Sequence, residues 1–94
     1  MANQENNDNT TYFDASADEA LLKSGPGRVG RLVIHTVGTT ATVILYDALT
    51  ATGNILYSWV TADGKIDVEL DARFETGLYL DISGTTPGGF VTWS

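Results

Sequence analysis

The apolar positions of this chain alternate with polar ones over many short stretches, which is the pattern of β-strands. In 66–70 (IDVEL), Ile66, Val68 and Leu70 alternate with acidic residues, as in an antiparallel strand with one buried and one solvated face. The stretch 78–82 (LYLDI) repeats this alternation. Further stretches rich in β-branched and aromatic residues complete the set, at 29–36, 41–47, 54–61 and 90–93.

Residues typical of turns separate these stretches. The short segment 38–40 (GTT) predicts that 29–36 and 41–47 form a hairpin, and Asp63-Gly64 marks the clearest turn in the chain. Strands recurring about every 8–12 residues, without a long helical pattern, predict an all-β fold. We expect a single small antiparallel β-sandwich, jelly-roll-like or Ig-like, of about six to seven strands, with a small closed barrel as the alternative.

The first part of the chain differs from the rest and predicts an extended N-terminal arm. It begins MANQENNDNT, a polar stretch without the cationic region and apolar run of a secretory signal. Ser16 and Glu19 then fit a capping box before a short helix, and an extended arm crossing the sheet is the equal alternative. The break at 24–27 (SGPG) ends either structure. We therefore expect an arm over 1–24 and a β-sandwich domain over 25–94.

The charge of the chain narrows the classes of partner. Twelve acidic residues stand against five basic ones, for a formal net charge of −7. Phosphate backbones and anionic bilayers repel such a chain, so we expect neither nucleic acid nor membrane as a partner. No stretch approaches the roughly 20 apolar residues that span a bilayer. The acidity favours solubility, or docking on a basic protein surface.

The sequence carries no convincing catalytic or metal-binding motif. There is no cysteine, and the single histidine, His35, lies within a predicted strand, where we expect a neighbour to satisfy it. Asp67, Glu69 and Asp71 share one strand face about 6.5–7 Å apart, which is too wide for one ion. A solvated face explains them better, and it opposes edge-to-edge aggregation if that strand is an edge. We predict no enzyme activity, no cofactor and no metal site.

The stretch 54–61 (NILYSWVT) is apolar on both faces. Tyr57 and Trp59 share one face, and we assign them to the core, with a platform for stacking sugar rings as the alternative. Leu56 and Val60 lie on the other face, so we expect the strand to be covered twice, by the fold and by a partner. With apolar residues of the arm and of the last strand, the candidate partner-binding set is Tyr12, Phe13, Leu21, Leu22, Leu56, Val60 and Trp93.

Five stretches of the chain together make a pattern that can be compared with known families. They are 21–28 (LLKSGPGR), 38–47 (GTTATVILYD), 73–74 (RF), 77–78 (GL) and 84–85 (GT). The second, with the pattern GT-x-ATV-x-LYD, is the most distinctive. Through them the chain from residue 21 to residue 94 resembles small all-β structural accessory proteins of tailed bacteriophages. The ending 92–94 (TWS) and the polar N-terminal tail depart from that pattern.

This resemblance implies a virion structural protein, without catalytic residues. The first expectation is a capsid decoration (cement) protein that stabilises a phage head through subunit–subunit contacts. Its implied partners are the major capsid protein or other virion proteins and further copies of itself, with a trimer favoured. Its implied location is the virion, assembled in the host cytoplasm. The alternatives are a tail- or fibre-associated phage protein and a small glycan- or cell-surface-binding module.

Overall fold

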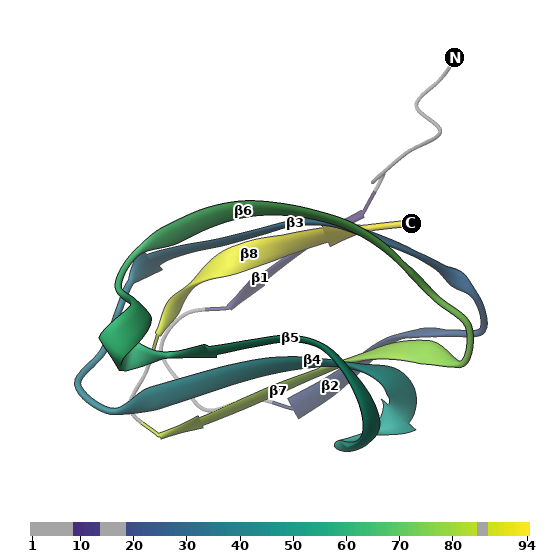
Figure 1. The fold of residues 1–94 in the computed structure, drawn as a ribbon, viewed down its shortest axis with the longest axis horizontal. Coiled ribbons are helices and arrows are strands. Elements are labelled where there is room, and N and C mark those ends of the chain that lie inside the picture. Colours follow the sequence, from purple (N-terminus) through teal and green to yellow (C-terminus); the bar gives the residue numbers. More distant parts are fainter. Residues whose placement is uncertain (1–8, 14–18, 85–86) are drawn as a thin grey trace.

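The structure is a computed structural model that describes residues 9–13, 19–84 and 87–94. Within these residues the chain forms strands joined by short loops and one 3₁₀ turn (Figure 1). The elements are β1 (Asn9–Phe13), β2 (Glu19–Ser24), β3 (Gly27–Thr36), β4 (Ala41–Thr50), β5 (Thr52–Val60), η1 (Thr61–Asp63), β6 (Ile66–Phe74), β7 (Gly77–Gly84) and β8 (Gly88–Trp93).

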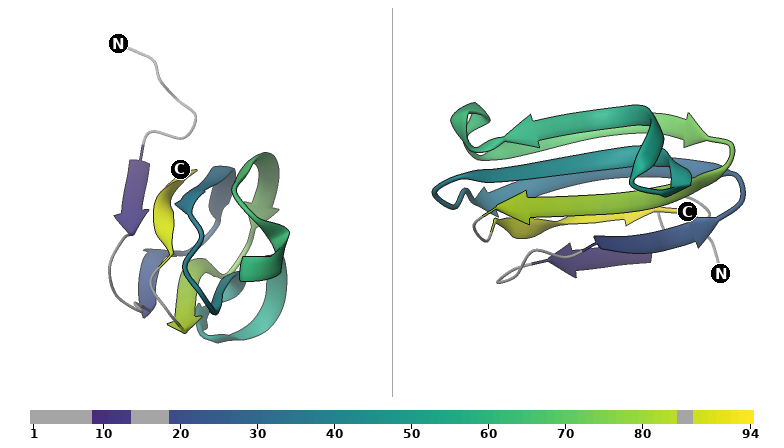
Figure 2. Two further views of the ribbon diagram at one scale, coloured as in Figure 1. Left: turned by 90° about the vertical axis from the view of Figure 1, so that its left-hand side faces the viewer. Right: turned by 90° about the horizontal axis from the view of Figure 1, so that it is seen from below.

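The described strands pack as two antiparallel four-stranded sheets, which confirms the predicted β-sandwich. One sheet has the order β1-β8-β3-β6 and the other has the order β2-β7-β4-β5. Figure 1 shows the first sheet above the second, and Figure 2 shows the same two layers from the side and from below. Each strand that alternates apolar and polar residues turns its apolar face into the space between the sheets.

The strand order resolves the choice between the two predicted types of sandwich. Strands β4 and β5 pair, and around them β3 pairs with β6, β2 with β7, and β1 with β8. The chain therefore behaves as one long hairpin rolled up, with the further pairs β3–β8 and β4–β7 closing the two sheets. This nested pairing is the jelly-roll topology.

The prediction that 29–36 and 41–47 form a hairpin is wrong. Strand β3 lies in one sheet and β4 in the other, so the loop 37–40 crosses between the layers. Among the described strands, β4 and β5 are the one consecutive pair that lies within a single sheet. Gly and Thr residues signal that the chain reverses, but they do not specify whether the next strand joins the same sheet or the facing one.

The predicted N-terminal arm supplies one edge strand to each sheet. Strand β1 pairs with β8 from Asn9–Trp93 to Phe13–Gly89, and β2 pairs with β7. The capping-box residue Ser16 lies outside the described residues, but Glu19 begins a strand, in agreement with the extended alternative. The predicted boundary at residue 24 therefore falls at the end of a sandwich strand. These two strands account for the difference between eight strands and the expected six to seven.

Both sheets contribute to one core. Trp59, Phe74 and Leu32 are its largest buried side chains, and each is 0% exposed. The core assignment of Trp59 is confirmed, and its indole Nε1–H donates a hydrogen bond to the carbonyl oxygen of Gly64 at 2.8 Å. The other core residues are Phe13, Val29, Ile34, Ala41, Val43, Leu45, Leu78, Leu80, Ile82 and Val91.

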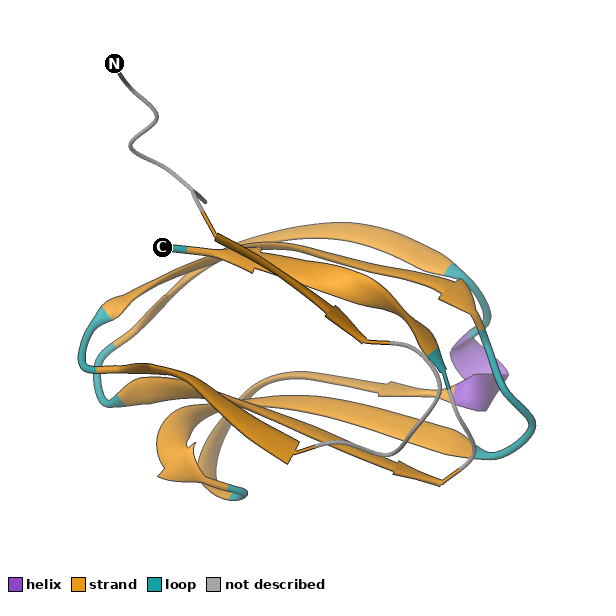
Figure 3. Cartoon of the chain, turned by 180° about the vertical axis from the view of Figure 1, so that it is seen from behind, coloured by secondary structure: helices purple, strands orange, loops and turns teal. Residues whose placement is uncertain are grey.

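The predicted Asp63-Gly64 turn carries the chain from one sheet to the other (Figure 3). A single 3₁₀ turn, η1, links β5 to β6, and Gly64 follows it with φ 76°. The Asp63 carboxylate accepts a hydrogen bond from the Val60 N–H at 3.1 Å, and the Gly64 N–H donates to the Thr61 carbonyl at 3.0 Å. The positive φ explains the glycine, since other residues adopt this conformation at a cost.

Candidate interaction surface

An apolar row crosses the outer face of the sheet β2-β7-β4-β5. The strand register places Leu21 beside Tyr79, Tyr79 beside Tyr46, and Tyr46 beside Ile55. One side chain from each strand thus forms a continuous line, which we call the apolar row (Leu21, Tyr79, Tyr46, Ile55). Leu21 is 45% exposed and Ile55 is 56% exposed, while the two tyrosines between them are partly buried.

Neighbouring positions extend this surface along β4 and β5. Ile44 lies opposite Ser58 on one side and Asp81 on the other. One step further, Thr42 pairs with Val60, which is 41% exposed. An apolar centre with a polar rim is the usual arrangement of a protein–protein contact surface.

The two predicted partner-binding residues of β5 lie on different faces of the sheet. Val60 lies on the outer face, as predicted, but Leu56 packs against the core. The cause is a β-bulge: Leu45 pairs with Tyr57 and the next residue, Tyr46, pairs with Ile55, so Leu56 is the extra residue. A bulge of this kind shifts the alternation by one residue and re-aims the side chains. The exposed place predicted for Leu56 therefore belongs to Ile55.

Of the other predicted partner-binding residues, Leu21 belongs to the apolar row and the remaining four do not. Tyr12 is 76% exposed on the outer face of the other sheet, where its ring lies 5.6 Å from that of Phe90. Phe13 is 5% exposed and belongs to the core, and Leu22 packs against it. Trp93 also packs against the core, and its Nε1–H donates to the Thr11 hydroxyl at 3.1 Å.

Tyr46, Tyr79 and Ile55 were not among the residues predicted from the sequence. The stretch 41–46 (ATVILY) held a usable signal, because Thr42, Ile44 and Tyr46 alternate with the core residues and are themselves largely apolar. A strand that is apolar on both faces inside a two-layer fold leaves one apolar face outside. Tyr79 gave no such signal, since its strand neighbours on the same face are Asp81 and Ser83.

The acidic strand β6 forms a solvated face, as predicted, and the structure places it at an edge. Asp67, Glu69 and Asp71 are all exposed, and β6 is the last strand of its sheet. Arg31 bonds the Asp67 carboxylate, and Arg28 bonds that of Asp71 at 3.0 Å. Such exposed pairs add little stability, but their charges oppose the pairing of this edge with another strand. Within the described ranges, no group of three or more His, Asp or Glu residues is placed to hold a metal ion.

His35 lies on an exposed strand position, with its Nδ1 3.0 Å from the hydroxyl oxygen of Thr36. This agrees with the prediction that a neighbour satisfies the imidazole.

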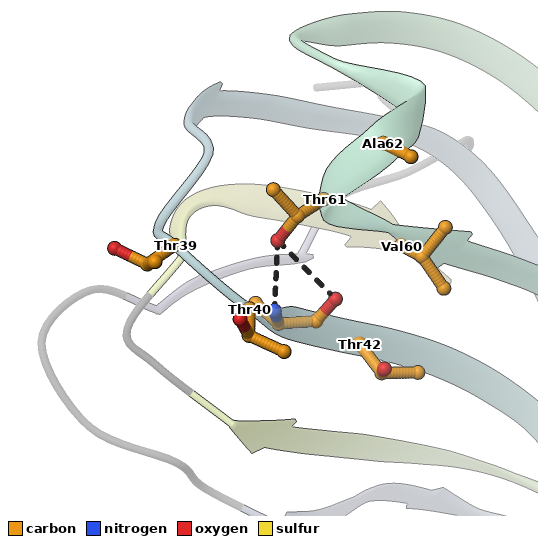
Figure 4. Close-up of a pocket in the computed structure, with 7 residues that line it drawn as sticks. Thr39, Thr40, Thr42, Val60, Thr61 and Ala62 are labelled. Atoms are coloured by element: carbon orange, nitrogen blue, oxygen red, sulfur yellow. Dashed lines mark hydrogen bonds between the residues drawn. The ribbon is translucent and has the colours of Figure 1, made fainter.

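A shallow hollow opens where the loop before β4 meets the end of β5 (Figure 4). It has a volume of about 400 Å³ and is lined by Thr39, Thr40, Ala41, Thr42, Val60, Thr61 and Ala62. The Thr61 hydroxyl accepts a hydrogen bond from the Ala41 N–H at 2.7 Å, which ties the two segments together. The hollow thus lies at the Val60 end of the outer face.

Asp47, the last residue of the distinctive GT-x-ATV-x-LYD pattern, anchors one end of the sandwich. Its carboxylate accepts hydrogen bonds from the backbone N–H groups of Glu75 at 3.1 Å, Thr76 at 2.8 Å and Gly77 at 3.4 Å. Burial acts to raise the pKa of this carboxyl, but the N–H groups of Thr76, Glu75 and Gly77 favour the anion, and the net effect lowers its pKa. The residue therefore holds the loop between β6 and β7 against β4.

Asp47→Asn is expected to lower the free energy of unfolding by about 1–2 kcal/mol near neutral pH, because the charge-assisted hydrogen bonds are lost. The folded-state pKa lies below the unfolded value of about 3.9, so this stabilisation is present above that pH and disappears as the pH falls through the folded-state pKa. Urea denaturation over a pH series measures the difference between the two proteins, which should shrink on acidification. Glu69→Gln, on the solvated face, is the control and should change stability by less than about 0.5 kcal/mol. A difference that stays constant at low pH would contradict the role of the anion.

Among the described residues there is no helix with the length and apolar character needed to cross a bilayer. Comparisons with protein-family models, curated proteins and solved structures gave no match to the chain.

Proposed function

We propose that this chain is a virion structural protein that attaches to the surface of a tailed-phage head as a decoration protein. The observation that supports the proposal is the apolar row, which crosses a whole sheet face and has exposed aliphatic side chains, Leu21 and Ile55, at its two ends. Its proposed partners are the major capsid protein or another virion protein. The resemblance of residues 21–94 to phage accessory proteins supplies the phage context.

The apolar row favours a protein partner because of its chemistry. The row has two tyrosines between two exposed aliphatic side chains, and tyrosine is enriched where proteins contact one another. Monomeric soluble proteins rarely leave a large contiguous apolar patch in water, and such patches commonly mark interaction sites. Burial against a protein surface would remove this apolar area from water and stabilise the attachment.

Charge and topology are consistent with the same proposal. A net charge of −7 favours a basic partner surface and accelerates association with it. Jelly rolls occur in viral capsid proteins and also in lectins, so the topology alone does not choose between a particle component and a sugar-binding module.

The aromatic side chains weigh against the sugar-binding alternative. That alternative requires an exposed tryptophan for stacking, but Trp59 is 0% exposed and bonds Gly64. Trp93 is partly buried, packs against the core and bonds Thr11. Neither indole forms the solvent-facing platform that a stacked sugar ring needs.

The proposal is tested on phage particles purified from a lysate in which this chain is produced. An antibody against the chain should detect it in particles banded on a density gradient, and gold labelling should place it on the head. Labelling confined to the tail would support the tail- or fibre-associated alternative instead. Complete loss of the chain from washed particles, while the major capsid protein remains, would refute attachment to the virion.

Ile55→Asp is expected to weaken attachment to chain-free particles about 30-fold, since it places an unpaired charge within the proposed apolar contact. Ile55 is 56% exposed in the free chain, so the fold should be retained. Co-sedimentation of the purified chain with the particles measures the effect. Thr10→Asp makes the same change of charge on the other sheet, at an exposed position of β1, and should bind normally. Equal binding by both variants would exclude the apolar row as the attachment surface.

A further inference from the structure

The four edge strands of the sandwich are not equally protected against pairing with another strand. The edges are β1, β6, β2 and β5. Strand β6 carries a ladder of charges, β2 contains Glu19 and Lys23, and β1 is only five residues long. Strand β5 spans nine residues and contains no Asp, Glu, Lys, Arg or Pro. Natural sheets usually protect long edges with charges, proline or short strands, because an open edge invites another strand.

The open edge of β5 is flanked by exposed apolar side chains. Among the described strands only β4 pairs with β5, so its other edge has no strand partner in the described chain. Ile55 and Val60 on β5, and Leu49 just before it, are among the most exposed large apolar residues at 56%, 41% and 46%. The hairpin of β4 and β5 therefore combines an unpaired edge with exposed apolar side chains.

We propose that two copies of this chain associate by pairing their β5 edges antiparallel about a two-fold axis. The pairing would join the two β2-β7-β4-β5 sheets into one continuous sheet. Strand addition at an open edge supplies main-chain hydrogen bonds, and a surface that pairs with itself closes after two copies. The pair differs in this respect from the trimer that the phage resemblance favours.

Ser58 is the residue of β5 that we place on the two-fold axis of the pair. Tyr57 and Trp59 face the core, whereas Ser58 is exposed between them. Directly opposed residues of an antiparallel pair point to the same face, so a two-fold axis at Ser58 sets Tyr57 of one copy opposite Trp59 of the other. The residue on the axis is then small and uncharged, and both cores stay on the same side of the joined sheet.

The same register places an apolar side chain beside the hollow of the second copy. Regular alternation covers residues 57–59, and beyond them the bulged segment Ile55–Leu56 of one copy runs alongside Val60–Thr61 of the other. The hollow lined by Val60, Thr61 and Ala62 opens there, at the end of β5 (Figure 4). Ile55 of one copy and the hollow of the other copy thus become neighbours in the pair.

The distribution of charge favours β5 over the other edges as the place where two copies meet. Each copy carries −7, so copies repel one another wherever their acidic side chains meet. Strand β5 is the long edge without such side chains. The acidic strand β6 follows β5 after a short turn and lies near the contact, with Asp67 and Asp71 bonded to arginines. Association should therefore strengthen with added salt, which screens the remaining repulsion.

The pair would also enlarge the outer face. A two-fold axis perpendicular to the joined sheet leaves both apolar rows on the same side. Four strands about 4.8 Å apart and about 20 Å long outline a face of roughly 400 Å² per copy, which is about half of what one partner contributes to a standard interface. The self-association itself does not depend on the proposed function, since it concerns the isolated chain.

The test is the molar mass of the purified full chain by light scattering and sedimentation equilibrium, with no particles present. A dimer at micromolar concentration, strengthened by salt, is the expected result. Ser58→Lys and Ser58→Glu each place like charges across the axis and should weaken association at least tenfold, while their mixture should restore a dimer. This restoration shows that neither variant failed to fold, and Thr10→Lys is the control with a charge added elsewhere.

Three outcomes would overturn the proposal. The first is a wild-type chain that stays monomeric at high concentration. The second is a trimer, which would require β5 to meet a different edge of the next copy. The third is dimerisation that neither Ser58 variant weakens. Because these outcomes concern the isolated chain, they are separate from a failure of particle attachment.

Discussion

Replacing Trp59 with alanine is expected to lower the free energy of unfolding by about 3–5 kcal/mol. Trp59 is 0% exposed, pairs with Val43 and belongs to the core between the sheets. The substitution removes the largest buried side chain and leaves the Gly64 carbonyl without its indole donor. A small domain has a total stability of about 5–15 kcal/mol, so the variant should be close to unfolding at physiological temperature. Urea denaturation followed by far-ultraviolet circular dichroism measures the change.

Two further substitutions separate packing from the hydrogen bond. Trp59→Phe keeps most of the buried ring but loses the N–H donor, so it should cost about 1–3 kcal/mol, less than Trp59→Ala. Ser58→Ala changes the adjacent exposed residue and should stay within about 0.5 kcal/mol of the wild type. A cost below about 1 kcal/mol for Trp59→Ala would mean that this side chain does not organise the core.

Gly89→Ala is expected to destabilise the fold by at least about 3 kcal/mol, although it adds a single methyl group. Gly89 lies between β1 and β3, where it pairs with Phe13 and with Ile34. A Cβ at this position would collide with the Val33 carbonyl oxygen and lie 3.0 Å from the Ile34 Cα. These are backbone atoms, which do not rotate out of the way, so β8 would have to separate from β3.

The preceding glycine provides a matched control for this prediction. A Cβ at Gly88 would meet side-chain atoms of Thr36 and His35 at 3.3–3.4 Å, and these can adjust. Gly88→Ala should therefore cost less than about 1 kcal/mol. Thermal unfolding of the two variants side by side tests the difference. Equal melting temperatures would show that β8 and β3 approach one another less closely at Gly89 than the structure indicates.

The alternation of apolar and polar residues predicted most of the individual strands. Period-two alternation is a local property, so 66–70 and 78–82 revealed their buried faces without knowledge of their partners. Strands β1 and β2 lacked this signal, because a short edge strand gains its order from the strand beside it. For this reason the residues of β1 and β2 were predicted as part of an arm over 1–24 and not as strands of the sandwich.

Pairing between strands was much harder to predict than the strands themselves. The turn at 38–40 looked like a hairpin, but β3 and β4 bury their apolar faces from opposite layers. The residues of a turn indicate only that the chain changes direction. Which sheet the next strand joins depends on its pairing with strands that are distant in the sequence. The sequence therefore left jelly-roll and Ig-like arrangements equally open.

The apolar row could be predicted only in part, because it is a property of register. Leu21 was predicted from its own apolar character, but its neighbours Tyr79, Tyr46 and Ile55 come from three other strands. The place of Ile55 in this row depends on the bulge at Leu56, and the sequence around Leu56 contains no signal that predicts a bulge. A shift of one residue would have turned Ile55 inward and Leu56 outward.

The nested strand pairing has a consequence for how the chain folds. Among the described strands only β4 and β5 pair across a short loop, while every pair further out closes a longer one, ending with Asn9 beside Trp93. Fold topologies of this kind form slowly, on the scale of milliseconds to seconds. Moreover β8, the last of the described strands in chain order, lies between β1 and β3. During synthesis β3 can pair with β6, but the first sheet cannot be completed until β8 has left the ribosome, because β1 and β3 are joined only through β8.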